Sequence, residues 1–130
     1  MLLDTSFLTD LMRGDENAVA RADELEENPV RQCLSAMTLF ELYYGVARSK
    51  QPDEERETVE EVLTTKPVQP ADSAVMQKAG RISGELENDG EALGDGDVII
   101  GATAAIVDEP VLTRNVSDFE RIAGVEVATY

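Results

Sequence analysis

Hydrophobic and polar residues follow one another along the chain in two kinds of pattern. Short apolar runs that end at a polar or turn-forming residue are typical of buried strands. Longer segments with an apolar residue at every third or fourth position are typical of helices. The first pattern predicts strands at 1–4, 30–35, 66–69, 110–113 and 125–129. The second predicts helices at 5–13, 15–28, 37–49, 53–63, 72–88 and 97–108, with a short helical turn at 119–122.

The order of these elements predicts the fold. Strands that alternate with helices favour a parallel sheet that is covered by helices on both faces. The segment 97–108 is apolar almost all round, which indicates a buried helix. No repeat and no long linker divides the sequence. We therefore expect an α/β protein, a three-layer α/β/α sandwich with a short parallel sheet of four to five strands, formed by 1–130 as one domain.

Missing residue types narrow the possible chemistry. The sequence contains no histidine, which excludes imidazole bases, Ser-His-Asp triads and histidine metal ligands. Its one cysteine, Cys33, excludes an internal disulfide and any metal site built from several cysteines. Catalysis by this chain would have to use carboxylates, hydroxyls, lysine or a bound metal ion.

The chain is strongly acidic, with 27 acidic and 11 basic residues and a net charge of −16. Such a charge by itself would repel nucleic acid. The acids are scattered along the chain, which favours a surface adapted to concentrated salt, where a Debye length of about 3 Å removes most self-repulsion. The longest apolar run, 98–107, is too short to span a membrane, and no leader pattern opens the sequence. We therefore expect a salt-adapted cytoplasmic protein.

Four acidic residues lie at predicted junctions between a strand and a helix. Asp4 ends the first strand, Asp97 opens the apolar helix, and Asp118 follows the strand at 110–113. Glu41 lies near the start of the helix after the second strand. Ligands of open parallel sheets bind beyond the carboxyl ends of the strands, so these carboxylates could meet there. They would repel one another unless protons or cations neutralised them, and an oxygen-only cluster suits Mg²⁺ or Mn²⁺.

Each acid also has a purely structural interpretation. Asp4, Asp97 and Asp118 all precede helical segments, where aspartate is a favoured N-cap. Glu41 and Thr38 together form the S/T-x-x-E pattern of a capping box. The sequence leaves both interpretations open.

Two glycines favour the metal-site interpretation. Gly45 follows Glu41 by four residues and Gly101 follows Asp97 by four, so each lies on the same helix face as its acid. Glycine inside a helix costs about 1 kcal/mol relative to alanine, which suggests a reason for its presence. Room for a metal or a phosphate is one reason, and close packing against another helix is the alternative.

Four motifs occur in order along the chain: Leu3-Asp4-Thr5-Ser6, Glu41-Leu42-Tyr43-Tyr44-Gly45, Asp97-Val98-Ile99-Ile100-Gly101-Ala102-Thr103-Ala104 and Thr113-Arg114-Asn115-Val116-Ser117-Asp118-Phe119. These motifs resemble those of PIN-domain ribonucleases and, more narrowly, of the VapC toxins of type II toxin–antitoxin pairs. The resemblance spans the chain. Gly101 departs from it, because the family more often has alanine there. Asp95 is an extra acid that could assist a metal site or be surface charge.

The resemblance implies an activity, partners and a set of site residues. The activity is Mg²⁺- or Mn²⁺-dependent endonucleolytic hydrolysis of RNA, performed by a toxin that a cognate antitoxin holds inactive; homodimers are common in the family. The catalytic and metal-binding residues would be Asp4, Glu41, Asp97 and Asp118. The residues that orient ligands or water through hydrogen bonds would be Thr5, Ser6, Thr113 and Asn115.

Candidate contacts to RNA are Arg48, Arg114 and Tyr43. Arginine holds phosphates and tyrosine stacks on bases. Pairing with the surplus acids is the alternative role of the two arginines. Tyr44 is expected in the core, because it follows Phe40 at helical spacing.

Three other functions remain open from the sequence. One is an RNA-processing nuclease of the same fold that works without an antitoxin. Another is a magnesium-binding phosphoacceptor domain, which also gathers acids at the edge of a sheet but usually has paired acids after its first strand. The third is a binding module without catalytic activity.

Overall fold

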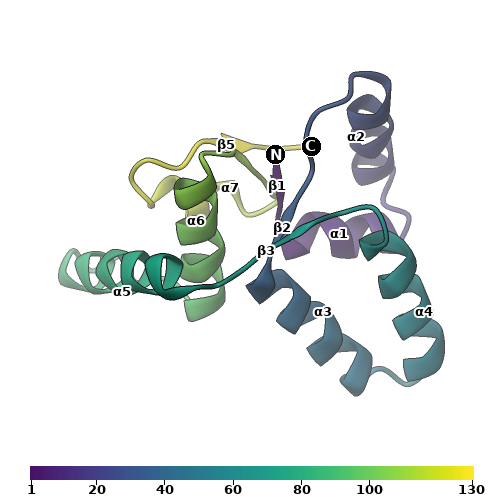
Figure 1. The fold of residues 1–130 in the computed structure, drawn as a ribbon, viewed down its shortest axis with the longest axis horizontal. Coiled ribbons are helices and arrows are strands. Elements are labelled where there is room, and N and C mark those ends of the chain that lie inside the picture. The colour runs from purple at the N-terminus through teal and green to yellow at the C-terminus, as the bar shows by residue number, and fades with distance from the viewer.

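The computed structural model describes residues 1–130, which form seven helices and five strands (Figure 1). The strands are β1 (Leu2–Leu3), β2 (Leu34–Ser35), β3 (Val68–Gln69), β4 (Val111–Leu112) and β5 (Val127–Ala128). The helices are α1 (Thr5–Met12), α2 (Glu16–Glu27), α3 (Ala36–Arg48), α4 (Pro52–Leu63), α5 (Ser73–Asn88), α6 (Asp95–Val107) and α7 (Val116–Glu120). None of these helices combines the length and the apolarity that a membrane span requires.

All strand pairs are parallel, as the alternation of strands and helices predicts. A three-stranded sheet has the order β1-β4-β5, and β2 pairs with β3. A parallel bridge between Leu2 and Cys33 joins the two sheets, so the strands run in the order β3-β2-β1-β4-β5. Because β1 lies at the centre, the residue that follows it lies in the middle of the carboxyl edge.

Helices cover both faces of the sheet, which confirms the three-layer sandwich. Successive strand residues point to opposite faces. Leu2 and Val111 therefore belong to a buried cluster with residues of α5, α6 and α7. Leu3 and Leu112 belong to a second cluster with residues of α1, α2, α3 and α4. Figure 1 shows α5, α6 and α7 on one side of the strands and the other four helices on the opposite side.

Most elements begin or end one or a few residues from the expected positions, and three of these differences have a local reason. The strand expected at 30–35 is ordered as a strand only from Leu34, because the residues before Cys33 have no pairing partner. α6 begins at Asp95, two residues earlier than expected, because Gly94 takes the extended N-cap position. α7 covers Val116–Glu120 rather than 119–122, with Asn115 at its N-cap.

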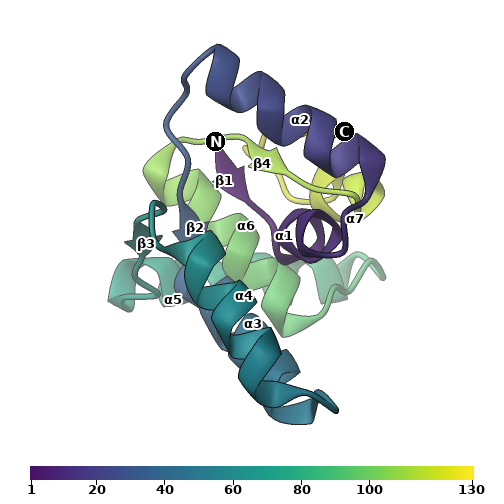
Figure 2. The same ribbon diagram turned by 90° about the vertical axis from the view of Figure 1, so that its right-hand side faces the viewer.

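The outer stripe of α3 is exposed, so the expectation that Tyr44 is a core residue is wrong. Phe40 is 63% and Tyr44 58% exposed. The buried face of α3 is the neighbouring stripe, which contains Leu42 and Val46 and packs toward α4. α3 and α4 extend together away from the sheet (Figure 2), so nothing covers the far side of α3.

Helix α6 is buried along most of its length, as its composition predicts. At Gly101 it packs against Ile122, which follows α7: a Cβ at this position would overlap Cδ1 of Ile122. The space beside this glycine is filled by the Ile122 side chain, which favours the packing interpretation over room for a metal or a phosphate.

Candidate active site

Segments that follow four different strands bring four carboxylates to one edge of the sheet. Asp4 directly follows the central strand β1, and Glu41 lies in the second turn of α3, the helix that follows β2. Asp97 and Asp118 lie in the first turns of α6 and α7. Burial, and then the charges of Asp4, Asp118 and Glu41, raise the pKa of Asp97 to about 6. All three other acids therefore act on Asp97 through space, as expected for one anionic cluster.

Only one carboxylate oxygen of Asp4 is hydrogen-bonded to the protein. Only 2% of the residue is exposed. The hydroxyls of Ser6 and Thr113 each donate a 2.7 Å hydrogen bond to the same oxygen, Oδ2. Oδ1 receives no hydrogen bond from the protein, and it is the oxygen left to bind a cation or a water.

Glu41 connects α3 to α1 and to the start of α6. Thr5 Oγ1 donates a 2.9 Å hydrogen bond to Glu41 Oε1 and lies 3.0 Å from the hydroxyl of Thr38. A Cβ at Gly96 would lie 3.2 Å from Glu41 Oε2, so a larger residue beside Asp97 would press on this carboxylate. Burial raises the pKa of Glu41, the hydrogen bond from Thr5 lowers it, and the charge of Asp4 raises it.

None of the four acids makes a capping hydrogen bond, so the capping interpretation is wrong. Asp4 occupies the N-cap position of α1 but its side chain makes no capping hydrogen bond. Gly94 and Asn115 are the N-caps of α6 and α7, which places Asp97 and Asp118 inside those helices. The N-cap of α3 is Ser35, whose Oγ accepts from the N–H of Met37, so Thr38 and Glu41 do not form a capping box.

The orienting residues are only partly in the expected places. Thr5, Ser6 and Thr113 each donate to one of the carboxylates, as described above. Asn115 reaches the site through its backbone: its N–H donates to Thr113 Oγ1 over 2.9 Å, and its side chain makes no hydrogen bond. The threonine hydroxyl thus links the start of α7 to Asp4.

The donor atoms fit a hard divalent cation. Every ionisable group of the cluster is a carboxylate, and oxygen ligands are those that Mg²⁺ and Mn²⁺ prefer. As placed, no three acidic or cysteine side chains lie close enough together to hold one ion. Burial is the largest cause of the raised pKa of Asp97, and the three neighbouring carboxylates raise it further; a cation would neutralise this second influence.

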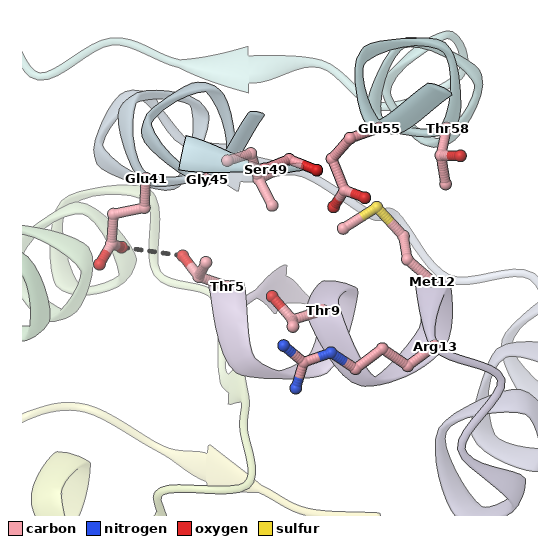
Figure 3. A pocket seen from close by; sticks show the side chains of 10 residues that line it. Thr5, Thr9, Met12, Arg13, Glu41, Gly45, Ser49, Glu55 and Thr58 are labelled. Carbon is pink, nitrogen blue, oxygen red and sulfur yellow. Dashed lines mark hydrogen bonds between the residues drawn. The ribbon is translucent and has the colours of Figure 1, made fainter. Parts of the chain in front are cut away.

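A cavity of about 420 Å³ opens beside Glu41, between α1, α3 and α4 (Figure 3). Thr5 and Glu41 lie at one end, and Arg13 and Glu55 at the other. Gly45 lines the cavity, and a Cβ there would meet nothing within 4 Å. This glycine therefore faces open space next to the acidic cluster, unlike Gly101.

The three candidate RNA contacts lie at different places. Arg114 lies in the loop between β4 and α7, directly after Thr113, with Nη1 2.6 Å from Asp10 Oδ1. Arg48 is two helical turns beyond Glu41, a rise of about 10 Å, and its guanidinium lies 5.8 Å from the centre of the Tyr44 ring. Tyr43 is partly exposed on α3. The fold brings only Arg114 to the carboxyl edge of the central strands.

Sequence reasoning missed two residues near the site, Asp10 and Tyr130. Tyr130 donates a 2.5 Å hydrogen bond to Asp10 Oδ2, and Asp10 also holds Arg114. No local pattern signals this contact, because its partners are separated by almost the whole chain.

Comparison with known proteins identifies the family of the chain. The family model described as the PIN domain matches residues 1–125. The tRNA(fMet)-specific endonuclease VapC of Salmonella typhimurium is 33% identical over 100 residues, which cover 77% of this chain and 76% of the relative. Its namesake from Shigella flexneri is 27% identical over 124 residues, 95% of this chain and 92% of the relative.

Solved structures show the same likeness over nearly the whole chain. The DNA-bound VapBC of Salmonella typhimurium superposes with a TM-score of 0.89 at 29% identity, covering 98% of this chain and 96% of the other. FitAcB of Neisseria gonorrhoeae superposes with a TM-score of 0.81 at 29% identity, covering 97% and 94%. Because the PIN domain model matches nearly the full length of the sequence, the chain belongs to the PIN domain family.

Proposed function

We propose that this protein is a metal-dependent endoribonuclease and the toxin of a toxin–antitoxin pair. The observation that carries the proposal is the placement of four carboxylates at the carboxyl edge of the sheet, where burial and the other three acids raise the pKa of Asp97. The tRNA(fMet)-specific endonuclease activity of its relatives supports RNA as the substrate. The resemblance to solved toxin–antitoxin complexes supports a protein antitoxin as the partner. These two observations favour a toxin over a processing nuclease, a phosphoacceptor or a silent binding module. Its place of action is the cytoplasm.

In this proposal Asp4, Glu41, Asp97 and Asp118 would hold Mg²⁺ or Mn²⁺ once their side chains move closer together than they lie in the structure. A bound divalent ion stabilises negative charge on the phosphoryl group and makes water more acidic. The chain's own residues keep the carboxylates in place: Ser6 and Thr113 fix one oxygen of Asp4, and Thr5 fixes one oxygen of Glu41. The cavity beside Glu41 gives an RNA strand access to this edge.

Cleavage of RNA by substituted proteins tests the proposal. Bulk tRNA is incubated with the protein and Mg²⁺ or Mn²⁺ at high KCl, and cleavage is followed on a denaturing gel. We expect Asp4→Asn and Asp97→Asn to abolish cleavage, because each removes a metal-binding charge without changing shape. Asp95→Asn is the matched control, because Asp95 is an exposed acid in the same helical turn as Asp97. Unimpaired turnover in both site variants would contradict the nuclease function.

Thermal unfolding gives a second readout that does not depend on activity. A ligand that binds only the folded state raises the melting temperature. We expect Mg²⁺ to raise that of the wild type and of Asp95→Asn, and not that of Asp4→Asn. KCl added to equal ionic strength separates binding from screening. An equal rise in all three proteins would argue against a metal at Asp4.

A further inference from the structure

A buried carboxylate outside the cluster of four acids holds two partners at once. Asp10 lies in α1, and only 11% of its side chain is exposed. Its Oδ1 accepts a 2.6 Å bond from Nη1 of Arg114, and its Oδ2 accepts a 2.5 Å bond from the phenol of Tyr130. The three residues come from α1, from the loop after β4 and from the segment after β5. The contact therefore ties three separate parts of the chain together.

This cluster is joined directly to the candidate active site. The backbone N–H of Arg114 donates a 3.1 Å hydrogen bond to Ser6 Oγ. Ser6 in turn donates to Asp4 Oδ2 over 2.7 Å. Thr113, the residue before Arg114, donates to the same oxygen of Asp4. The main chain that carries Arg114 is thus fixed to the carboxylate at the centre of the edge.

Arg114 is oriented but still accessible. Its side chain is 56% exposed, although its partner Asp10 is buried. Only Nη1 of its guanidinium is bonded, so the donors at Nε and Nη2 remain free. A planar guanidinium with free donors suits a phosphate, which accepts hydrogen bonds from both arms of the group. The chain has a net charge of −16 and repels anions overall. A positively charged side chain fixed beside the acidic cluster can attract an anionic substrate there.

We infer that Asp10 and Tyr130 are positioning residues, which hold Arg114 so that its guanidinium binds an RNA phosphate next to the bond that is cleaved. The inference rests on the proposed ribonuclease function. Asp10 and Tyr130 contact neither the metal nor the substrate in this arrangement. Arg114 is the residue that binds the RNA phosphate.

The phenol of Tyr130 has a specific task in this arrangement. It takes one acceptor site on Oδ2 of Asp10 and so competes with a two-armed contact from Arg114, which bonds Asp10 through Nη1 alone. The ring of Tyr130 packs edge-on against Phe7, with centroids 5.0 Å apart, which fixes the direction of the hydroxyl. Burial and the bond to Asp10 raise the pKa of Tyr130 above its usual range, so the hydroxyl stays a donor throughout the neutral pH range.

Binding of RNA tests the role of Arg114. Every protein carries Asp97→Asn, so that RNA stays intact, and binding of a fluorescent single-stranded oligoribonucleotide in Mg²⁺ is followed by anisotropy at several KCl concentrations. Arg114→Ala is expected to weaken binding about tenfold, because it removes a charge-assisted hydrogen bond. It should also reduce the salt slope by about 0.7, the value for one phosphate contact on a single strand.

The chain offers a matched control in Arg56. It is also half exposed and ion-paired, with Asp53 and Glu60 of α4, and it does not line the cavity beside Glu41. Arg56→Ala makes the same change in net charge and is expected to leave both the affinity and the salt slope unchanged. Equal losses in Arg114→Ala and Arg56→Ala would mean that only overall charge matters, which overturns the inference.

Steady-state cleavage tests the roles of Tyr130 and Asp10 in the protein with Asp97 restored. Tyr130→Phe keeps the ring and removes only the hydroxyl, and we expect about a threefold rise in KM with little change in kcat. Asp10→Asn is expected to act in the same direction. In an Arg114→Ala background, Tyr130→Phe should have no further effect on KM, because it acts through Arg114.

Two results would overturn the inference. One is an unchanged KM in Tyr130→Phe and Asp10→Asn, and the other is an equal effect of Tyr130→Phe with and without Arg114. The free energy of unfolding, measured for each variant, identifies a purely structural role, which lowers stability without this dependence on Arg114. Absence of cleavage by the wild type would instead contradict the ribonuclease function, so the two failures are distinguishable.

Discussion

Burial and the negative charge of Asp4 are the two largest influences that raise the pKa of Asp97 to about 6. Asp4 follows the central strand and Asp97 lies in the first turn of α6, so only the fold brings them near each other. The metal-free cluster therefore carries a repulsion that weakens the folded state whenever Asp97 is ionised. Charge repulsion that lowers the stability of the folded state is common at functional sites.

The stability of the metal-free protein should fall as the pH rises. The folded-state pKa of Asp97 lies above its unfolded value of about 3.9, so the folded state binds more protons between these values. The stabilising contribution is complete below about pH 4 and is lost as the pH rises through about 6. After allowance for solvent screening, the loss is on the order of 2 kcal/mol. Urea unfolding in EDTA at several pH values measures it.

Substitution of Asp97 provides the comparison for this pH dependence. In Asp97→Asn, the free energy of unfolding should no longer fall between about pH 4 and 6 because of this carboxyl group. The variant should also be more stable than the wild type at pH 7 without metal. Asp95→Asn should keep the wild-type slope, since Asp95 is exposed. Identical slopes in all three proteins would mean that Asp97 titrates normally and that the acids do not interact.

The hydroxyl of Thr113 should contribute more to stability and to RNA cleavage than its methyl group does. It donates to Asp4 Oδ2 and accepts from the N–H of Asn115, and the residue is completely buried. Thr113→Val leaves the N–H without this partner, and we expect a loss of about 2 kcal/mol in stability. Cleavage should fall at least about tenfold, because Asp4 loses one of its two orienting bonds.

Thr113→Ser is the matched variant for that measurement. It keeps the hydroxyl and loses only the methyl group, so most of the activity should return. Urea unfolding and the rate of RNA cleavage are compared for the three proteins. If valine were tolerated as well as serine, the hydrogen bonds to Asp4 and Asn115 would have no role in the site.

The free energy of unfolding should increase with KCl concentration. A net charge of −16 repels itself in the compact state, and salt screens this repulsion. The exposed face of α4 allows a control, because Glu54, Glu57 and Glu61 are all exposed and make no ion pair. Replacing these three with lysine should make stability less dependent on KCl. An unchanged dependence would attribute the effect of salt to something other than surface charge.

The homodimer implied by the resemblance remains a prediction, and α3 offers the surface for it. Phe40 and Tyr44 lie on one exposed stripe, and buried aromatic side chains contribute strongly to interfaces. Phe40→Ser with Tyr44→Ser should shift the protein toward a monomer in sedimentation equilibrium at high KCl. Val19→Ser on α2 is a control at another exposed apolar side chain. A dimer of unchanged affinity in the double variant would exclude this stripe.

Local sequence patterns determined the elements and the chemistry available to the chain. Apolar spacing predicted the helices and the parallel strands, because the periods of both elements are set by the backbone. The absence of histidine limited catalysis to carboxylates, hydroxyls, lysine or a metal. The positions of Asp4 and Asp97 at junctions after strands predicted that acids would gather at one edge.

The tertiary structure decided every question that depends on contacts between distant segments. The sequence allows both the capping and the cluster interpretation of the four acids. Only the packing of α1, α3, α6 and α7 distinguishes between them. Gly45 and Gly101 occur in the same local pattern, yet one faces a cavity and the other packs against Ile122. The contact of Asp10 with Tyr130 joins opposite ends of the chain. Local patterns report on neighbours within a turn or two, whereas these contacts depend on how whole helices pack against the sheet.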